Sequence, residues 1–166
     1  MSEAAAGNSG LDLTMNTRDE GSPDDAATPT PRTINQGCKD IPAQVPGVVT
    51  VSSLTQSGQL SYFSNRGLGE IDVAAPGSRI ASTVPGGWAY KSGTSMASPH
   101  VAGVLALMKS MHPELTPAQM VQKLEDDATP TECSAPQYDE GEACVGTAEL
   151  NSYYGHGIVN ALKAVQ

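Results

Sequence analysis

The feature that most constrains the fold is a nearly unbroken run of apolar and small residues from Met96 to Met111. Pro99 falls where a first helical turn would lie, and there a missing backbone N–H costs little. Pro113 follows the run and stops it. The pattern predicts one helix over 96–111, with Thr94 or Ser95 as its N-cap. Because apolar residues occupy every face of this helix, we expect it to be buried all round.

The remaining segments predict strands and helices in alternation. Three β-branched or apolar stretches, residues 47–54, 70–77 and 79–87, are typical of short strands. A second helix should begin at Thr116, where Thr-Pro-Ala-Gln forms a capping box. A third is expected over 158–165. Strands mixed with helices indicate an α/β layered fold.

Composition and charge exclude several classes of function. The 166 residues are enough for one domain with a core, and the net charge of −9 disfavours nucleic acid as a partner. No basic face is available for a membrane, and no apolar run reaches the roughly 18 residues of a spanning helix. The first ten residues lack the basic and apolar regions of a secretory signal peptide. Residues 9–46 are acidic and Pro-rich, and we expect a long irregular loop there.

The chain contains three cysteines. Cys133 and Cys144 bracket a turn-rich acidic loop, so a disulfide between them is geometrically easy and would indicate an oxidising compartment. The alternative is two free thiols. Cys38 is left over, and an odd cysteine suggests a partner outside this chain.

Ser95 is a candidate nucleophile at the start of the predicted helix. Unpaired backbone N–H groups and the positive end of the helix dipole stabilise negative charge there. An acyl-transfer nucleophile needs such stabilisation of negative charge, because an oxyanion develops beside it. The commoner role of a serine at such a position is simply to cap the helix.

A nucleophilic serine also needs a base within about 3 Å. His100 lies five residues after Ser95, which is about 140° round the helix, and His112 lies about 25 Å along its axis. His156 stands between two glycines near the C-terminus. We therefore expect structural or surface roles for all three histidines, with His100 a packing residue.

Two blocks of this sequence carry a family resemblance. The stretch GTSMASPHVAG at 93–103 resembles the active-site serine block of the subtilisin-like serine proteases, the subtilases. The stretch AAAGNSG at 4–10 resembles their oxyanion block. Residues 45–54, 62–67, 71–77 and 154–165 resemble further blocks in the same order. The resemblance covers essentially the whole chain and implies a serine endopeptidase in which Ser95 is the nucleophile and Asn8 binds the oxyanion.

The resemblance implies further roles at named positions. Thr94 and the run Ala5, Ala6 and Gly7 match substrate-binding positions, and the small run leaves room for a large apolar substrate side chain. Close packing is the alternative for that run. Asp72 matches a position that helps to bind a cation in some relatives, so Ca²⁺ is a candidate structural ion, although the chemistry needs no cofactor. An extracellular location is also implied.

The resemblance also shows what these residues lack. The family carries an Asp-Thr/Ser-Gly block and a His-Gly-Thr block upstream of the asparagine block, and neither occurs here. We therefore expect a partial subtilisin-like parallel sheet flanked by helices, truncated on the N-terminal side, with Met-Ser-Glu replacing the strand that should lead into Ala4. Residues 1–166 are interpreted as the C-terminal portion of a catalytic domain, with 9–46 and 130–150 as loop insertions.

Two hypotheses follow for the function. In the first, the chain is an endopeptidase whose partners are a peptide or protein substrate and the upstream half that supplies the triad Asp and His, and it is inactive alone. In the second, it is a non-catalytic fragment or an assembly piece of a split subtilase.

Overall fold

A three-stranded parallel sheet forms the centre of the molecule. The computed structural model describes residues 2–19, 28, 30–35, 37–133 and 143–166. The sheet has the order β1–β4–β5, built from β1 (Ser2–Ala5), β4 (Val48–Leu54) and β5 (Val73–Pro76). The strands predicted at 47–54 and 70–77 are therefore confirmed. The fold class predicted from sequence, α/β with a partial parallel sheet packed on helices, is also what the structure has.

β1 corrects one expectation. Ser2 and Glu3, which we expected to replace a strand, are themselves in one and pair with Val48 and Val49 of β4. The pairing uses backbone hydrogen bonds, so it does not require apolar side chains. β1 is also the edge strand, where the Ser2 side chain can stay exposed.

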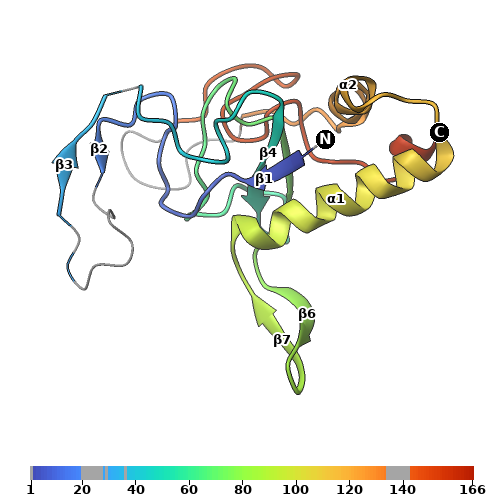
Figure 1. Cartoon of the computed structure of the whole chain (residues 1–166), viewed down its shortest axis with the longest axis horizontal. Helices are drawn as coiled ribbons and strands as arrows, with labels where there is room; N and C mark the ends of the chain where they lie inside the picture. Colours follow the sequence, from blue (N-terminus) through green and yellow to red (C-terminus); the bar gives the residue numbers. More distant parts are fainter. Residues whose placement is uncertain (1, 20–27, 29, 36, 134–142) are drawn as a thin grey trace.

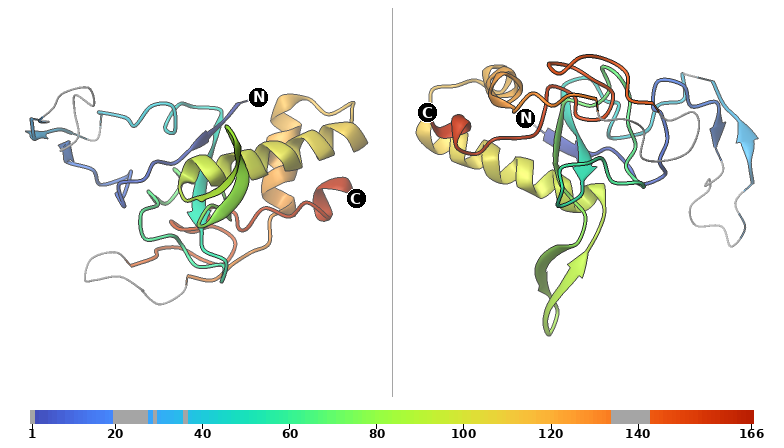
Figure 2. Two further views of the ribbon diagram at one scale, coloured as in Figure 1. Left: turned by 90° about the horizontal axis from the view of Figure 1, so that it is seen from below. Right: turned by 180° about the vertical axis from the view of Figure 1, so that it is seen from behind.

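Helices cover one face of the sheet (Figure 1). Helix α1 (Thr94–Met111) packs across β1, β4 and β5, and α2 (Pro117–Asp127) and the short 3₁₀ helix η1 (Lys163–Val165) lie against α1 near its C-terminal end (Figure 2). The capping box at Thr116 is present, as predicted. The main core lies between these layers and consists of Val49, Val51, Val73, Ala75, Ala97, Val101, Val104, Leu105, Met108, Met120, Leu124, Ala128 and Ala164.

Helix α1 is buried on one side only, so the expectation of burial all round is wrong for this chain. The face toward the sheet is buried, whereas Ala102, Gly103, Ala106, Leu107 and Met111 are exposed. The sheet, α2 and η1 cover a single side, and the opposite apolar side meets solvent. The predicted N-cap is also wrong, because Gly93 occupies that position and caps the helix with no side-chain hydrogen bond.

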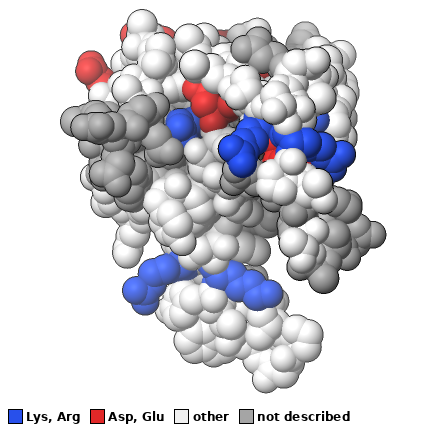
Figure 3. Space-filling view, turned by 90° about the vertical axis from the view of Figure 1, so that its left-hand side faces the viewer, with Lys and Arg blue, Asp and Glu red and all other residues white. Residues whose placement is uncertain are grey.

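A β-hairpin projects from the body beside the start of α1 (Figure 1). Its strands are β6 (Ile80–Val84) and β7 (Gly87–Lys91), and the sequence predicted only the first. The segment 78–92 has two charged residues, Arg79 and Lys91, both basic. Figure 3 accordingly shows blue side chains where the hairpin joins the body and no red on the hairpin. This face therefore differs in charge from the acidic chain as a whole.

Two further expectations need correction. Within the loop predicted at 9–46, β2 (Arg18–Asp19) pairs antiparallel with β3 (Arg32–Thr33). At the C-terminus, the helix predicted over 158–165 is only the single turn η1. The side chain of Asn160 accepts hydrogen bonds from Leu162 and Lys163 N–H and starts the turn there. The helical turn that follows, Lys163–Val165, packs against α1 and α2.

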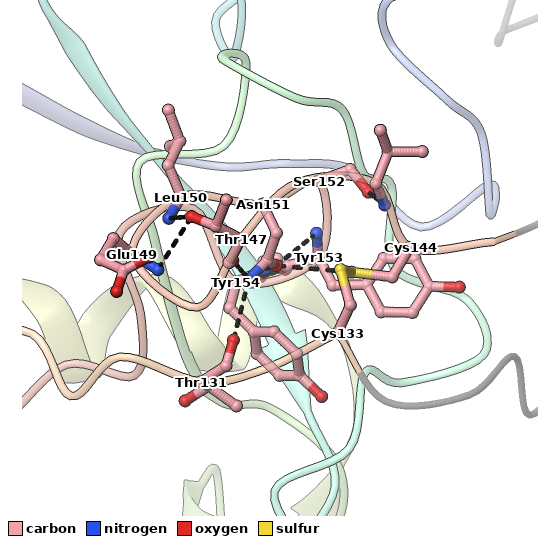
Figure 4. Close-up of a disulfide and its surroundings, with 12 residues drawn as sticks. Thr131, Cys133, Cys144, Thr147, Glu149, Leu150, Asn151, Ser152, Tyr153 and Tyr154 are labelled. Carbon is pink, nitrogen blue, oxygen red and sulfur yellow. Dashed lines mark hydrogen bonds between the residues drawn. A yellow bond between two sulfur atoms is a disulfide. The ribbon is translucent and has the colours of Figure 1, made fainter.

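A disulfide and a buried asparagine organise the segment before the C-terminus (Figure 4). Cys133 and Cys144 are bonded, with an S–S distance of 2.08 Å, while Cys38 is an exposed free thiol. Asn151, which is fully buried, donates to Thr131 O and Thr147 O and accepts from the backbone N–H groups of Tyr153 and Tyr154. One amide thus joins both sides of this segment.

Among the described residues, no helix combines the length and apolar character that crossing a lipid bilayer requires.

Candidate active site

The site forms where the loop after β1 meets the first turn of α1. The side-chain oxygen of Asn8 accepts a hydrogen bond from Thr94 N–H at 2.8 Å and another from the Thr94 hydroxyl at 3.0 Å. Ser95 follows in the first turn of the helix and is exposed. The tertiary fold therefore brings the two residues singled out by the sequence, Asn8 and Ser95, to the same helix end.

These contacts fix which way the Asn8 amide points. A backbone N–H can only donate, so the oxygen of the amide must face Thr94. Its NH₂ group then remains able to donate. An ideal Cβ added to Gly93 would lie 3.6 Å from Asn8 Nδ2, which places the amide against the residue two positions before Ser95. A donor on Asn8 and the N-terminus of α1 can thus face one oxyanion.

Thr94 orients Asn8 and is itself buried. Its hydroxyl donates to Asn8 Oδ1 and accepts from Gly7 N–H at 3.2 Å. The Thr94 side chain thus contacts the loop that carries Asn8, and a substrate-binding role for Thr94 stays a prediction. The sequence held no local signal for this pairing, because Thr94 and Gly7 are far apart along the chain.

The small residues before Asn8 have unequal surroundings. Ala6 is fully buried in a cluster with Leu13 and Ile71, whereas Ala5 and Gly7 are partly exposed. Close packing therefore accounts for the Ala6 methyl. Gly7 has a positive φ of 103°, and a Cβ on it would lie 2.3 Å from Nδ2 of Asn65. Only glycine fits at this position.

Asn65 is a site residue that the sequence reasoning did not single out. It lies within the block at 62–67 and is almost completely buried beside the loop that carries Asn8. A lone asparagine between Ser64 and Arg66 resembles a loop residue, and only tertiary contacts reveal its surroundings.

No histidine of this chain is joined to Ser95 by a hydrogen bond in the part of the chain that the structure describes. Nδ1 of His100 pairs with Met96 O at 2.8 Å. This side chain is exposed, so the packing role predicted for it is wrong within the described residues. His112 lies 3.8 Å from Glu114, and His156 lies 3.8 Å from Glu125. Among the described residues, each of the three histidines thus pairs with a group other than Ser95.

Asp72 directly precedes β5, and its charge interacts with those of Glu70, Glu125 and His156. Its carboxylate accepts from Thr50 N–H at 2.5 Å, and its carbonyl accepts from His156 N–H. Burial raises the pKa of Asp72, and the Thr50 hydrogen bond and the His156 charge only partly offset this. Burial also raises the pKa of Glu125, against the lowering effect of His156.

A cation site at Asp72 would need oxygen ligands besides this carboxylate. The described residues contain no group of three or more His, Cys, Asp or Glu side chains arranged to hold a metal ion. One oxygen of the Asp72 carboxylate is already committed to a backbone N–H. Calcium binding at Asp72 therefore stays a prediction.

Fold and site together define an α/β protein with a serine at a helix N-terminus beside an asparagine amide. The model of the subtilase family matches residues 2–157, and the chain belongs to that family.

Similar proteins extend well beyond the residues of this chain. Subtilisin E of Bacillus subtilis is 40% identical over 126 residues, which span 75% of this chain but 28% of that protein. An extracellular protease of Xanthomonas campestris is 43% identical over 134 residues, covering 75% of this chain and 20% of that protein. The chain thus spans less than a third of either.

Solved structures agree with the sequence comparisons. The epidermin leader peptide processing serine protease of Staphylococcus aureus matches with a TM-score of 0.67 and 27% identity, over 100% of this chain and 40% of that chain. A protease from Pseudoalteromonas arctica matches with a TM-score of 0.59 and 33% identity, over 75% of this chain and 37% of that chain.

Proposed function

We propose that this chain supplies the nucleophile and the oxyanion hole of a subtilisin-like serine endopeptidase. The observation that carries the proposal is the Asn8 side chain bonded to Thr94 N–H, beside Ser95 at the N-terminus of α1. Ser95 Oγ attacks the peptide carbonyl carbon, and the resulting oxyanion accepts hydrogen bonds from Asn8 Nδ2 and Ser95 N–H. The substrate is a peptide or protein, and cleavage proceeds through an acyl-enzyme.

The proton of Ser95 has to pass to a base outside these residues. In the family, a histidine takes this proton and an aspartate orients the histidine. Loss of the histidine lowers kcat of subtilisin itself by about 10⁶-fold. We therefore propose that the chain acts only with an upstream segment that carries the His and Asp blocks, and that it is nearly inactive alone.

The uncovered surface supports such a partner. One face of α1 exposes Leu107 and Met111, and β1 pairs with β4 on one edge only among the described strands. Parallel sheets are normally covered on both faces and extended by neighbouring strands. An upstream segment that adds strands beside β1 and covers α1 would bury both features.

We also propose an extracellular location. A similar protein carries the name extracellular protease, and the Cys133–Cys144 disulfide suits an oxidising compartment. Ca²⁺ as a structural ion and a first specificity pocket walled by Ala5, Ala6 and Gly7 remain predictions.

The test is reconstitution. The chain is co-produced with an upstream segment of subtilisin E that carries the family's His and Asp blocks, and the complex is treated with a fluorophosphonate. We expect covalent labelling that disappears in Ser95→Ala and falls strongly in Asn8→Ala. A folded complex that is not labelled at Ser95 would refute the proposal and favour the second hypothesis, a non-catalytic fragment or assembly piece.

A further inference from the structure

We propose that Asn65 is the positioning residue that holds the oxyanion loop, and hence Asn8, in register with Ser95. This inference rests on the proposed function. The loop in question, residues 6–11, leaves β1 and carries Asn8 at its exposed turn. Asn8 needs a rigid backbone beneath it, because its amide must meet a developing charge at a fixed point.

The Asn65 side chain binds this loop on both sides of Asn8. Its Nδ2 donates to Ala6 O at 2.9 Å, before Asn8 in the chain. Its Oδ1 accepts from Ser9 N–H at 3.1 Å and from Leu11 N–H at 3.0 Å, after Asn8. One planar amide therefore fixes the distance across the turn.

Backbone contacts strengthen the same attachment. Asn65 N–H donates to Gly7 O at 2.9 Å, so main chain and side chain of one residue both bind the loop. Gly7 has no room for a Cβ because Asn65 Nδ2 occupies that space. The loop and Asn65 are thus in direct contact throughout the residues that precede Asn8.

The chemistry selects asparagine at this position. The second hydrogen of Nδ2 donates to Asp40 Oδ2 at 3.3 Å, so both donors and both acceptor sites of the amide are used. Aspartate would keep the acceptors but lose the donors. Serine is too short to reach the loop on both sides of Asn8. Only 1% of Asn65 is exposed, so water cannot replace these bonds.

Asn8 is therefore held from two directions. Asn65 fixes the backbone on either side of it, and Thr94 fixes the oxygen of its amide. Misplacement by about 1 Å can cost an enzyme about 10²-fold in rate. We expect loss of Asn65 to reduce catalysis through Asn8, without any contact between Asn65 and substrate.

The test is a double-mutant cycle in the reconstituted complex. Asn65→Ser is combined with Asn8→Ala, and kcat and KM are measured with a chromogenic peptide. The matched control is Asn151→Ser, because Asn151 is an equally buried amide with two donor and two acceptor bonds, all to the segment 131–154. If Asn65→Ser does not fold, Asn65→Asp replaces it in the double-mutant cycle.

We expect Asn65→Ser to lower kcat at least about tenfold with KM nearly unchanged, and to have an effect below about threefold once Asn8 is alanine. Asn151→Ser should lower thermal stability and leave kcat within about twofold. The inference would be overturned if the Asn65 and Asn8 substitutions lowered kcat independently, so that the double variant showed the product of the two single effects. A kcat loss in Asn151→Ser equal to that in Asn65→Ser would also overturn it. An unsubstituted complex without Ser95-dependent activity would instead refute the proposed function, and the basis for the inference with it.

Discussion

At the scale of single residues, the site depends on groups that orient other groups. Asn8 and Ser95 carry the proposed chemistry, but Thr94 sets the direction of the Asn8 amide and Gly7 leaves space for Asn65. These supporting residues are small or buried, so their roles come from hydrogen-bond geometry and from space. Each one can be tested by a substitution that removes or crowds its contacts.

Removing the Thr94 hydroxyl should weaken the oxyanion hole. Thr94→Val loses the donor to Asn8 Oδ1 and leaves Gly7 N–H without its acceptor. One such hydrogen bond is worth about 1 kcal/mol, so we expect kcat of the reconstituted complex to fall about fivefold. Thr94→Ser keeps the hydroxyl and should retain most of the rate. Equal rates for the two variants would contradict the orienting role.

A methyl group at Gly7 should disturb the same loop. Gly7→Ala combines a strained positive φ of 103° with a Cβ only 2.3 Å from Asn65 Nδ2. We expect slower fluorophosphonate labelling of Ser95. Gly47→Ala is the control, since Gly47 also has a positive φ, 83°, but nothing lies within 4 Å of its Cβ. Both changes add backbone strain of about 1–3 kcal/mol, and only Gly7→Ala should slow labelling.

At the scale of secondary-structure elements, ionisable groups join α2 to the turn before the C-terminus. The Glu125 carboxylate of α2 lies 3.8 Å from the ring Nε2 of His156. The backbone N–H of His156 donates to the backbone carbonyl of Asp72. The two carboxylates are partly desolvated and repel each other, and the His156 charge opposes both effects. The packing of α2 should therefore depend on pH.

Glu125→Gln tests this dependence. The pKa of Glu125 is higher in the folded chain than its unfolded value of 4.5, so the folded state holds its proton more tightly. Ionised Glu125 therefore costs stability at neutral pH, and this cost disappears as pH falls below the unfolded value. We expect Glu125→Gln to raise the denaturation midpoint modestly at pH 7 and to have no effect near pH 4. The exposed Glu114 serves as control through Glu114→Gln, and an equal gain there would argue against the desolvation cost.

At the scale of the whole molecule, the apolar surface is unevenly covered. The core between the sheet, α1 and α2 is well packed, yet 49% of Leu107 and 57% of Met111 are exposed on the far side of α1. Leu107 and Met111 are four residues apart, so they are neighbours on one side of α1 and not single scattered apolar residues. This face of α1 is the surface at which we place the upstream segment.

The isolated chain should self-associate through this face. We expect its apparent mass in size-exclusion chromatography to rise with concentration, and Leu107→Glu with Met111→Lys to reduce that rise. Met15→Lys is the control, because 68% of Met15 is exposed in a different region. Association unaffected by the α1 substitutions would show that another surface is responsible. Addition of the upstream segment should also suppress association.

The sequence alone determined the features that depend on local pattern. The helix after Ser95, the capping box at Thr116 and the strands at 48–54 and 73–76 follow from apolar periodicity and turn residues. The family also followed from sequence, because the blocks around Asn8 and Ser95 are long and specific.

Tertiary structure decided everything that depends on residues far apart in the chain. It decided that α1 is covered on one side, because coverage depends on which elements pack there. It decided that Gly93 and the Asn8 side chain, rather than Thr94 or Ser95, complete the helix start. It also gave Asn65 its place beneath the oxyanion loop. A hydrogen bond across more than fifty residues has no local signature, so only the folded chain reveals that Asn8 is held by Asn65 and Thr94.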